Sequence, residues 1–299
     1  MTTTTTTTTA KAHPVTRRGR SPWEAFRRLP WWGAVLLLVL LGLLWIYPFV
    51  WMVSASLKSS TEIFSGGVSL WPEEFVWENY ARAWDDAGFG RYMLNTVIVT
   101  LATVVIVVVR CALCGYVLGR YRFPGSRIVI GILVATLFVP TGYTIIPIVK
   151  LSMELGVLNS LTGMVLALGG AANVSFILIY AGYFRQLPKE LEEAAIMDGA
   201  GFFRVFWTIM LPLSMPVTAT VALLTFLATW NAFFLPLVFS FSRPELRTLS
   251  VGMQAFVGEN ATDWSGMAAA GVISIVPIVV LFLFLQRYFV EGIAGAVKS

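Results

Sequence analysis

The densest group of chemically active side chains in this chain of 299 residues is acidic. Glu190, Glu192, Glu193 and Asp198 fall within nine residues, and Gly199 follows them. A proline just before the acids suits the start of a helix, the acids suit its positive N-terminal end, and the glycine suits a left-handed stop. We expect a helix of two to three turns. Helices that lie on lipid headgroups are the alternative, but those carry Lys and Arg on their polar face, so docking into a groove of another protein is favoured.

The sequence contains few of the residues and motifs on which enzyme catalysis usually depends. His13 is the sole histidine and lies in the N-terminal tail, so the folded part has no histidine base and no histidine metal ligand. Cys111 and Cys114 form a C-x-x-C spacing, but both lie deep in an apolar stretch, which indicates packing rather than redox chemistry. No phosphate-binding loop of the G-x-x-x-x-G-K-[ST] type occurs. We expect no catalytic residue, no metal site and no cofactor on this chain.

The composition predicts an all-α integral membrane protein. Hydrophobic residues make up 57%, charged residues 12%, and the mean hydropathy is +0.78. A span of about 20 apolar residues crosses a bilayer, and six segments qualify. These are Trp31–Val53, Tyr92–Leu118, Ile128–Val149, Leu161–Phe184, Ile209–Asn231 and Met267–Gln286.

The basic residues predict how these spans are oriented. With the N-terminus inside, fourteen Lys and Arg residues fall on the cytoplasmic side and six outside, which satisfies the positive-inside rule. Residues 1–30 are then a basic, disordered cytoplasmic tail, 31–288 a six-helix membrane domain, and 289–299 a cytoplasmic C-terminal tail. Both termini and the acidic loop, residues 185–212, face the cytoplasm of a plasma (inner) membrane. The net charge of +5 is a topology signal and calls for no nucleic acid.

Two functions of different kinds compete with each other at this point. An ion-coupled secondary transporter would carry acids or histidines within its spans, and the six spans contain neither. A transporter powered by a separate ATPase explains both this absence and the docking loop. A membrane scaffold without transport is the third reading, but it gives no account of the polar residues within the spans.

A substrate path through the spans would need aromatic faces and hydrogen-bonding groups. The candidates are Asn173, Trp230, Asn231, Tyr143 and Arg110. Each of the polar ones could instead bond between packed helices. For Arg110 two interpretations stay open. In the functional one, its side chain faces the path or pairs across a subunit interface. In the other, it bonds to backbone carbonyls or a neighbouring hydroxyl and serves packing only.

The acidic helix also begins a longer spaced pattern. Its fixed positions are Glu193-Ala194-Ala195, three residues, Gly199, nine residues, Ile209, one residue, and Leu211-Pro212. This pattern resembles the cytoplasmic EAA loop of binding-protein-dependent ABC importers. The resemblance implies the type I permease architecture with a cytoplasmic coupling helix, in which the ATPase-coupling residues are Glu193, Ala194, Ala195, Asp198, Gly199, Leu211 and Pro212.

The resemblance extends from Trp31 to Ser299 and narrows to the maltose-type carbohydrate importers. Further matching pieces are Leu94-Asn95-Thr96, Arg120-Tyr121-Arg122-Phe123-Pro124-Gly125, Val251-Gly252-Met253-Gln254 and the stretch from Gln286 to Lys298. It implies a sugar substrate, membrane lipid around the spans, a second homologous permease, an extracytoplasmic sugar-binding protein, and two ATPase subunits that hold the ATP and Mg²⁺. It also implies a second ATPase contact by the C-terminal tail. Arg110 departs from the apolar residue usual in that family.

Overall fold

The computed structural model describes residues 31–67, 69–170, 173–258 and 262–296. The chain divides into two units, one up to Val50 and one from Trp51 onward. Helices are the regular elements throughout the described ranges, and one antiparallel bridge joins Val257 to Thr262. The predicted all-α class is therefore confirmed. The tail predicted over residues 1–30 lies outside the described residues.

The first unit is described by a single apolar helix, α2, Trp31–Ala55, whose last residues belong to the second unit. It contains Pro48 and no charged residue. All of its leucines except the half-buried Leu37 are exposed, as expected of a surface that faces lipid rather than water. The helix covers the first predicted span.

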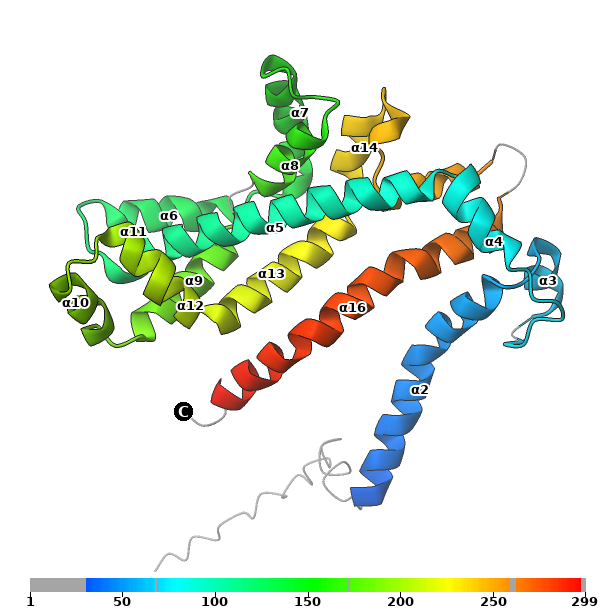
Figure 1. The fold of residues 1–299 in the computed structure, drawn as a ribbon, viewed down its shortest axis with the longest axis horizontal. Coiled ribbons are helices and arrows are strands. Elements are labelled where there is room, and N and C mark those ends of the chain that lie inside the picture. Colours follow the sequence, from blue (N-terminus) through cyan, green and yellow to red (C-terminus); the bar gives the residue numbers. More distant parts are fainter. Residues whose placement is uncertain (1–30, 68, 171–172, 259–261, 297–299) are drawn as a thin grey trace, which may run out of the picture. The chain divides into compact units, whose positions relative to one another are not determined.

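The second unit is organised around α5, Phe89–Arg120, a helix of 32 residues. Along α5 pack α9, Val174–Gln186, and α13, Met215–Trp230. The long helix α16, Trp264–Ala296, packs against α13 (Figure 1). Near the middle of α5 lie α8, Leu161–Gly169, and α14, Phe234–Ser240.

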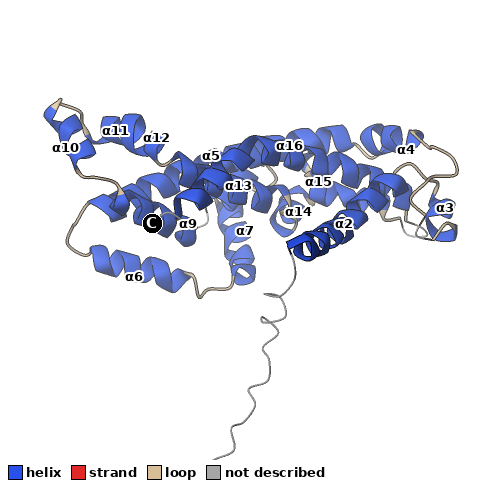
Figure 2. Cartoon of the chain, turned by 90° about the horizontal axis from the view of Figure 1, so that it is seen from below, coloured by secondary structure: helices blue, strands red, loops and turns tan. Residues whose placement is uncertain are grey.

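Shorter helices lie at the two ends of α5. Figure 2 shows α10 to α12 at one end, and α3 and α4 at the other. Their bounds, with those of the remaining short elements, are α3 Ser60–Ser65, α4 Glu78–Ala81, the π-helix Arg82–Asp86, α6 Ser126–Thr136, the 3₁₀ turn Thr141–Thr144, α7 Ile145–Glu154, α10 Glu190–Met197, α11 Phe202–Val205, the π-helix Phe206–Met210, α12 Leu211–Leu213, the 3₁₀ turn Pro244–Leu246, α15 Leu249–Gly252 and the 3₁₀ turn Met253–Phe256.

Three helices of the described residues are long and apolar enough to cross a membrane, or five if each of two bent pairs counts as one span. The predicted span Ile128–Val149 is not one helix: α6 ends at Thr136, because Pro140 forces the residue before it out of the helical region. The span Leu161–Phe184 is two helices, α8 and α9, and Asn173 between them has a left-handed φ of 43°. The described residues therefore do not form the six continuous spans that the sequence predicts.

The remaining span boundaries also differ from those predicted. The fifth predicted span, Ile209–Asn231, is also interrupted. Its main helix, α13, begins at Met215, because Pro216 has no N–H to donate to the carbonyl of Pro212, and the chain bends by 81° between Leu213 and Met215. The sixth continues as α16 to Ala296, past the predicted end at residue 286. Helical residues thus continue into the stretch from residue 289 that is predicted to be the cytoplasmic tail.

Close contact between α5 and α9 forms the core nearest the acidic loop. A Cβ added to Gly115 would lie 2.4 Å from Cβ of Tyr180, and one added to Gly119 would lie 2.7 Å from the Ala181 carbonyl oxygen. Glycine at both positions lets the two backbones meet. Fully buried aromatic side chains fill the space around this crossing, among them Tyr116, Tyr180, Phe184 and Phe206.

Candidate functional site

The acidic helix predicted from the sequence is present as α10, Glu190–Met197. Its first turn contains Glu190, Glu192 and Glu193, where the positive end of the helix dipole attracts negative charge. Gly199 follows with a φ of 80°, a left-handed conformation that side chains with a Cβ avoid. The predicted helix and its glycine stop are both confirmed.

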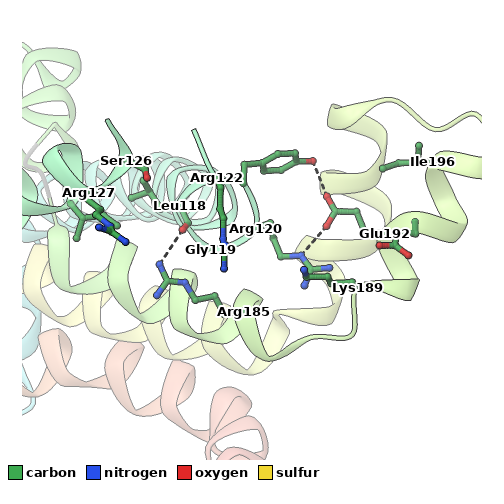
Figure 3. Close-up of a pocket in the computed structure, with 13 residues that line it drawn as sticks. Leu118, Gly119, Arg120, Arg122, Ser126, Arg127, Arg185, Lys189, Glu192 and Ile196 are labelled. Carbon is green, nitrogen blue, oxygen red and sulfur yellow. Dashed lines mark hydrogen bonds and ion pairs between the residues drawn. The ribbon is translucent and has the colours of Figure 1, made fainter. Parts of the chain in front are cut away.

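Of the acids on α10, Glu192 is the one that points inward. Its Oε1 accepts hydrogen bonds from the Tyr116 hydroxyl at 2.6 Å and the Tyr121 hydroxyl at 2.7 Å. Its Oε2 accepts from Nε of Arg120 at 2.8 Å (Figure 3). The Arg120 and Glu192 side chains are only 5% and 12% exposed, so this is a nearly buried ion pair.

Arg120 binds two helices at once. Besides Glu192, its guanidinium donates to the carbonyl oxygens of Phe184, Leu187 and Pro188, at 3.3, 2.8 and 3.2 Å. The Phe184 carbonyl lies in the last turn of α9, where helical carbonyls have no partner of their own, and the other two lie in the connection to α10. Arg120, on the last turn of α5, therefore fixes the end of α9 and the start of α10 together. We call Arg120, Glu192, Tyr116 and Tyr121 the clamp.

Electrostatics favour the charged form of the clamp carboxylate. Burial by itself would raise the pKa of Glu192. The hydrogen bonds from Tyr116, Arg120 and Tyr121 and the positive charge of Arg120 outweigh it and hold that pKa below its ordinary value of 4.5. Glu192 is thus ionised at neutral pH, as an ion pair with Arg120 requires.

The other residues of the predicted coupling pattern divide by exposure. Ala195 is buried in the core beside Tyr116 and Phe206. Glu193, Ala194, Asp198 and Gly199 are exposed, Leu211 is half-buried and Pro212 exposed. Exposed apolar side chains lie among them, namely Leu191, Ile196, Met197, Phe203 and Trp207. The region thus presents a mixed acidic and apolar surface, and the clamp attaches its inner side to the ends of α5 and α9.

The predicted substrate-path residues do not gather at one place. Trp230 is 3% exposed, stacks on Phe226 and donates to the Ser274 carbonyl oxygen at 3.2 Å, so its ring is part of the core. Asn231 is exposed and donates to the Leu227 carbonyl oxygen at the end of α13. Tyr143 is 77% exposed on the 3₁₀ turn after Pro140.

Arg110 and Asn173 lie in one region of the bundle. Arg110 is half-buried on α5, and Sγ of the next residue, Cys111, lies 4.0 Å from the Asn173 carbonyl oxygen. Cys111 is buried, but Cys114 is exposed, which corrects the expectation that both thiols are packed inside the span. No cluster of three or more His, Cys, Asp or Glu side chains suited to a metal occurs in the described ranges.

Sequence reasoning missed the clamp partners on α5. Tyr116, Arg120 and Tyr121 follow each other at spacings of four and one, which places the first two on one face of α5. A basic residue in the last turn of a helix was a usable signal, but its partner 72 residues later was not visible in the sequence.

A second set of contacts lies at the other end of α5. Nδ2 of Asn95 donates to the carbonyl oxygens of Glu245 and Arg247, at 2.8 and 2.9 Å. The hydroxyl of Thr96 accepts from the Leu249 N–H at 2.8 Å. Two of the matching sequence pieces, around Asn95 and around Gly252, are thereby brought together, and the Gly252 backbone lies against the Tyr92 ring.

Comparison with known proteins gives this arrangement a family. Residues 112–295 match the family described as binding-protein-dependent transport system inner membrane component. The chain is 36% identical to the diacetylchitobiose uptake system permease protein NgcG of Streptomyces coelicolor, over 88% of this chain and 86% of that protein. It is 32% identical to the melibiose/raffinose/stachyose import permease protein MelC of Bacillus subtilis, over 84% and 91%.

More distant likenesses agree with these two. The sn-glycerol-3-phosphate transport system permease protein UgpE of Yersinia pestis is 31% identical over 88% of this chain and 95% of its own. A solved bacterial ABC transporter involved in the import of the acidic polysaccharide alginate contains a chain with a TM-score of 0.76 and 26% identity, over 91% of this chain and all of that one. The chain therefore belongs to the binding-protein-dependent inner membrane components of ABC transporters, of the carbohydrate-uptake type, as a multi-pass transport subunit that is not an enzyme, carries no cofactor and relies on a separate ATPase.

Proposed function

We propose that this chain is one half of the translocation path of an ATP-driven oligosaccharide importer. Two relatives are named for the uptake of diacetylchitobiose and of melibiose, raffinose and stachyose, which supports a short neutral sugar chain as substrate. The other half is a second homologous permease, and the binding protein delivers the sugar from outside. In this proposal the chain crosses the membrane six times, with interrupted crossings among them, so that both termini and α10 lie in the cytoplasm, where two ATPase subunits bind.

The observation that carries this proposal is how α10 is mounted. Its outer surface exposes Glu193, Asp198 and apolar side chains, while Glu192 and Ala195 are held inside by the clamp and the core. An outer surface that is polar and apolar by turns suits a protein groove. An inner surface fixed by buried polar bonds suits the transfer of motion to the membrane helices.

The proposed coupling can be tested with Glu193→Lys in the complex assembled with its ATPase. Like charges facing each other across an interface cost several kcal/mol, so we expect ATPase retention and sugar-dependent transport to fall by at least about tenfold. The matched control is Glu154→Lys, the same charge reversal at an exposed position on α7. ATPase retained on purified membranes and uptake into proteoliposomes are the two measurements.

A second variant guards against a folding defect. Gly199→Ala places a side chain at a left-handed position where no atom lies within 4 Å of the new Cβ, so it strains the backbone without a clash. We expect it to uncouple ATP hydrolysis from uptake while the protein yield is kept. Normal coupling in both Glu193→Lys and Gly199→Ala would reject α10 as the point of energy input. A panel of labelled oligosaccharides in the same uptake assay identifies the substrate.

A further inference from the structure

A basic cavity of about 700 Å³ lies beside the clamp and is lined in part by the clamp residues Arg120, Tyr121 and Glu192. It opens where α5 ends, α6 begins, α9 ends and α10 begins (Figure 3). Four cationic side chains line it in addition to the clamp arginine: Arg122, Arg127, Arg185 and Lys189. They come from two stretches of sequence, 122–127 and 185–189, which the fold brings together.

The charges of this cavity do not balance. Arg120 and Glu192 neutralise each other, which leaves Glu193 as the one acid against four cations on its lining. Within the described residues Arg122, Arg127 and Lys189 form no ion pair or side-chain hydrogen bond. Arg185 makes one hydrogen bond, to the Leu118 carbonyl oxygen at 3.2 Å. Four like charges around one space repel each other, and an anion there would relieve that repulsion.

The surroundings indicate which anion would fit. Ile130 lines the cavity, and the α6 residues Ile128 and Ile132 are 69% and 62% exposed on the same apolar helix. A soluble anion would gain nothing from an apolar helix surface beside the cations. A phospholipid would bind both features, because its acyl chains pack on the apolar surface while its phosphate pairs with the cations.

We propose that this cavity binds the phosphate headgroup of an anionic phospholipid, whose acyl chains lie along α6. The guanidinium groups of Arg122 and Arg127 match phosphate oxygens with paired N–H donors, and Lys189 adds a point charge. Lys189 is the residue just before α10. A lipid bound here therefore contacts the base of α10, and the headgroup composition of the membrane affects how firmly α10 is held. The proposal goes beyond the transport function and does not depend on the identity of the sugar.

The test uses the full-length chain in a mild detergent and native mass spectrometry. Phosphatidylglycerol, phosphatidylcholine and inorganic phosphate are titrated separately against the wild type and the double variant Arg122→Gln, Arg127→Gln. Each cation close to an anionic lipid contributes about a fivefold affinity, so we expect the double variant to bind phosphatidylglycerol roughly 30-fold more weakly. Phosphatidylcholine should bind weakly to both, and millimolar inorganic phosphate should not displace the lipid.

The matched control is Arg91→Gln, Arg204→Gln, which removes the same charge from exposed arginines outside the cavity. It should bind phosphatidylglycerol as the wild type does. Lys189→Gln is a milder variant, expected to weaken binding about fivefold, in case the double variant folds poorly. Equal binding by the wild type and both cavity variants overturns the proposal. Binding of inorganic phosphate as tight as that of the lipid overturns the lipid in favour of a free phosphate. Loss of ATPase retention in the cavity variants, with lipid binding unchanged, overturns it in favour of an acidic protein partner.

Discussion

Three hydrogen-bond donors converge on the Glu192 carboxylate, and their arrangement explains why this acid differs from its neighbours. Glu190 and Glu193 lie on the same short helix and are exposed, whereas Glu192 is 12% exposed at its side chain. The sequence predicts acids at the start of a helix, but it does not distinguish the one that turns inward. That choice depends on Arg120, which is far away along the chain. Removing one partner of such a buried pair costs about 3–5 kcal/mol, so the clamp is the most sensitive residue contact of the loop.

The ionisation of Glu192 makes the clamp pH-dependent. Because its pKa is lower in the folded protein than its ordinary value of 4.5, its contribution to stability is present above that value and is lost as the pH falls through the folded pKa. Glu192→Gln removes the charge, and a buried hydrogen bond to a charged group is worth about 1–3 kcal/mol. We expect the variant to unfold at a lower temperature than the wild type at pH 7, and the difference to shrink below about pH 4.5.

Thermal unfolding of the detergent-solubilised chain between pH 7 and pH 3 measures this difference. Glu190→Gln is the matched control, since Glu190 is exposed on the same helix and forms no ion pair within the described residues. It should unfold with the wild type at every pH. A gap between Glu192→Gln and the wild type that stays constant down to pH 3 would mean that the clamp does not depend on ionisation.

Among the helices, the crossing of α5 and α9 decides where the loop is placed. Gly115 and Gly119 are spaced four residues apart, a small-xxx-small pattern that allows two helices in a membrane to approach closely. This signal was readable in the sequence, because Gly115 lies inside the predicted span Tyr92–Leu118 and Gly119 directly follows it. The breaks at Asn173 and before Met215 were harder to predict. The sequence is apolar on both sides of each break, so composition does not reveal either one. The helices are interrupted by backbone geometry, namely the missing N–H of Pro216 and the left-handed conformation of Asn173.

Gly115→Ala tests the crossing. The new Cβ would lie 2.4 Å from Cβ of Tyr180 and 2.9 Å from the Ile177 carbonyl oxygen, so the helices must separate, at a cost of about 1–3 kcal/mol. Gly182→Ala on α9 is the matched control, because no atom lies within 4 Å of its added Cβ. We expect a lowered unfolding temperature for the first variant and an unchanged or slightly raised one for the second. Equal unfolding temperatures would show that the two helices do not meet through Gly115.

Sequence composition was most informative about the class of the whole protein. The apolar content predicts an all-helical membrane protein, and the spaced pattern from Glu193 to Pro212 predicts the permease family; both are confirmed. The substrate path was not predictable to the same degree. Trp230, an aromatic residue suited to sugar rings, is a core residue, because its indole N–H bonds to α16. A polar or aromatic residue in a span serves packing and transport with the same side chain, and spacing alone does not separate the two.

The predicted orientation of the chain in the membrane can be tested by labelling single cysteines. In a background with Cys111→Ala and Cys114→Ala, single cysteines are placed at Lys189, next to α10, and at Lys150 on α7, both exposed. The distribution of basic residues predicts that the α10 end lies in the cytoplasm. A maleimide that cannot cross membranes should label Lys150→Cys in intact cells and Lys189→Cys only after the cells are permeabilised. The reverse pattern would invert the topology and exclude contact between α10 and a cytoplasmic ATPase.

Because α5 is a continuous helix with a polar attachment at each end, the two attachments cannot move independently. The stretch of α5 from Asn95, which contacts the Glu245–Arg247 segment, to Arg120 of the clamp spans about 38 Å at 1.5 Å per residue. For a rigid rod of that length pivoting at one end, a tilt of about 5° displaces the other end by about 3 Å. A small rotation imposed on α10 would therefore displace the opposite end of α5 by about the length of a hydrogen bond.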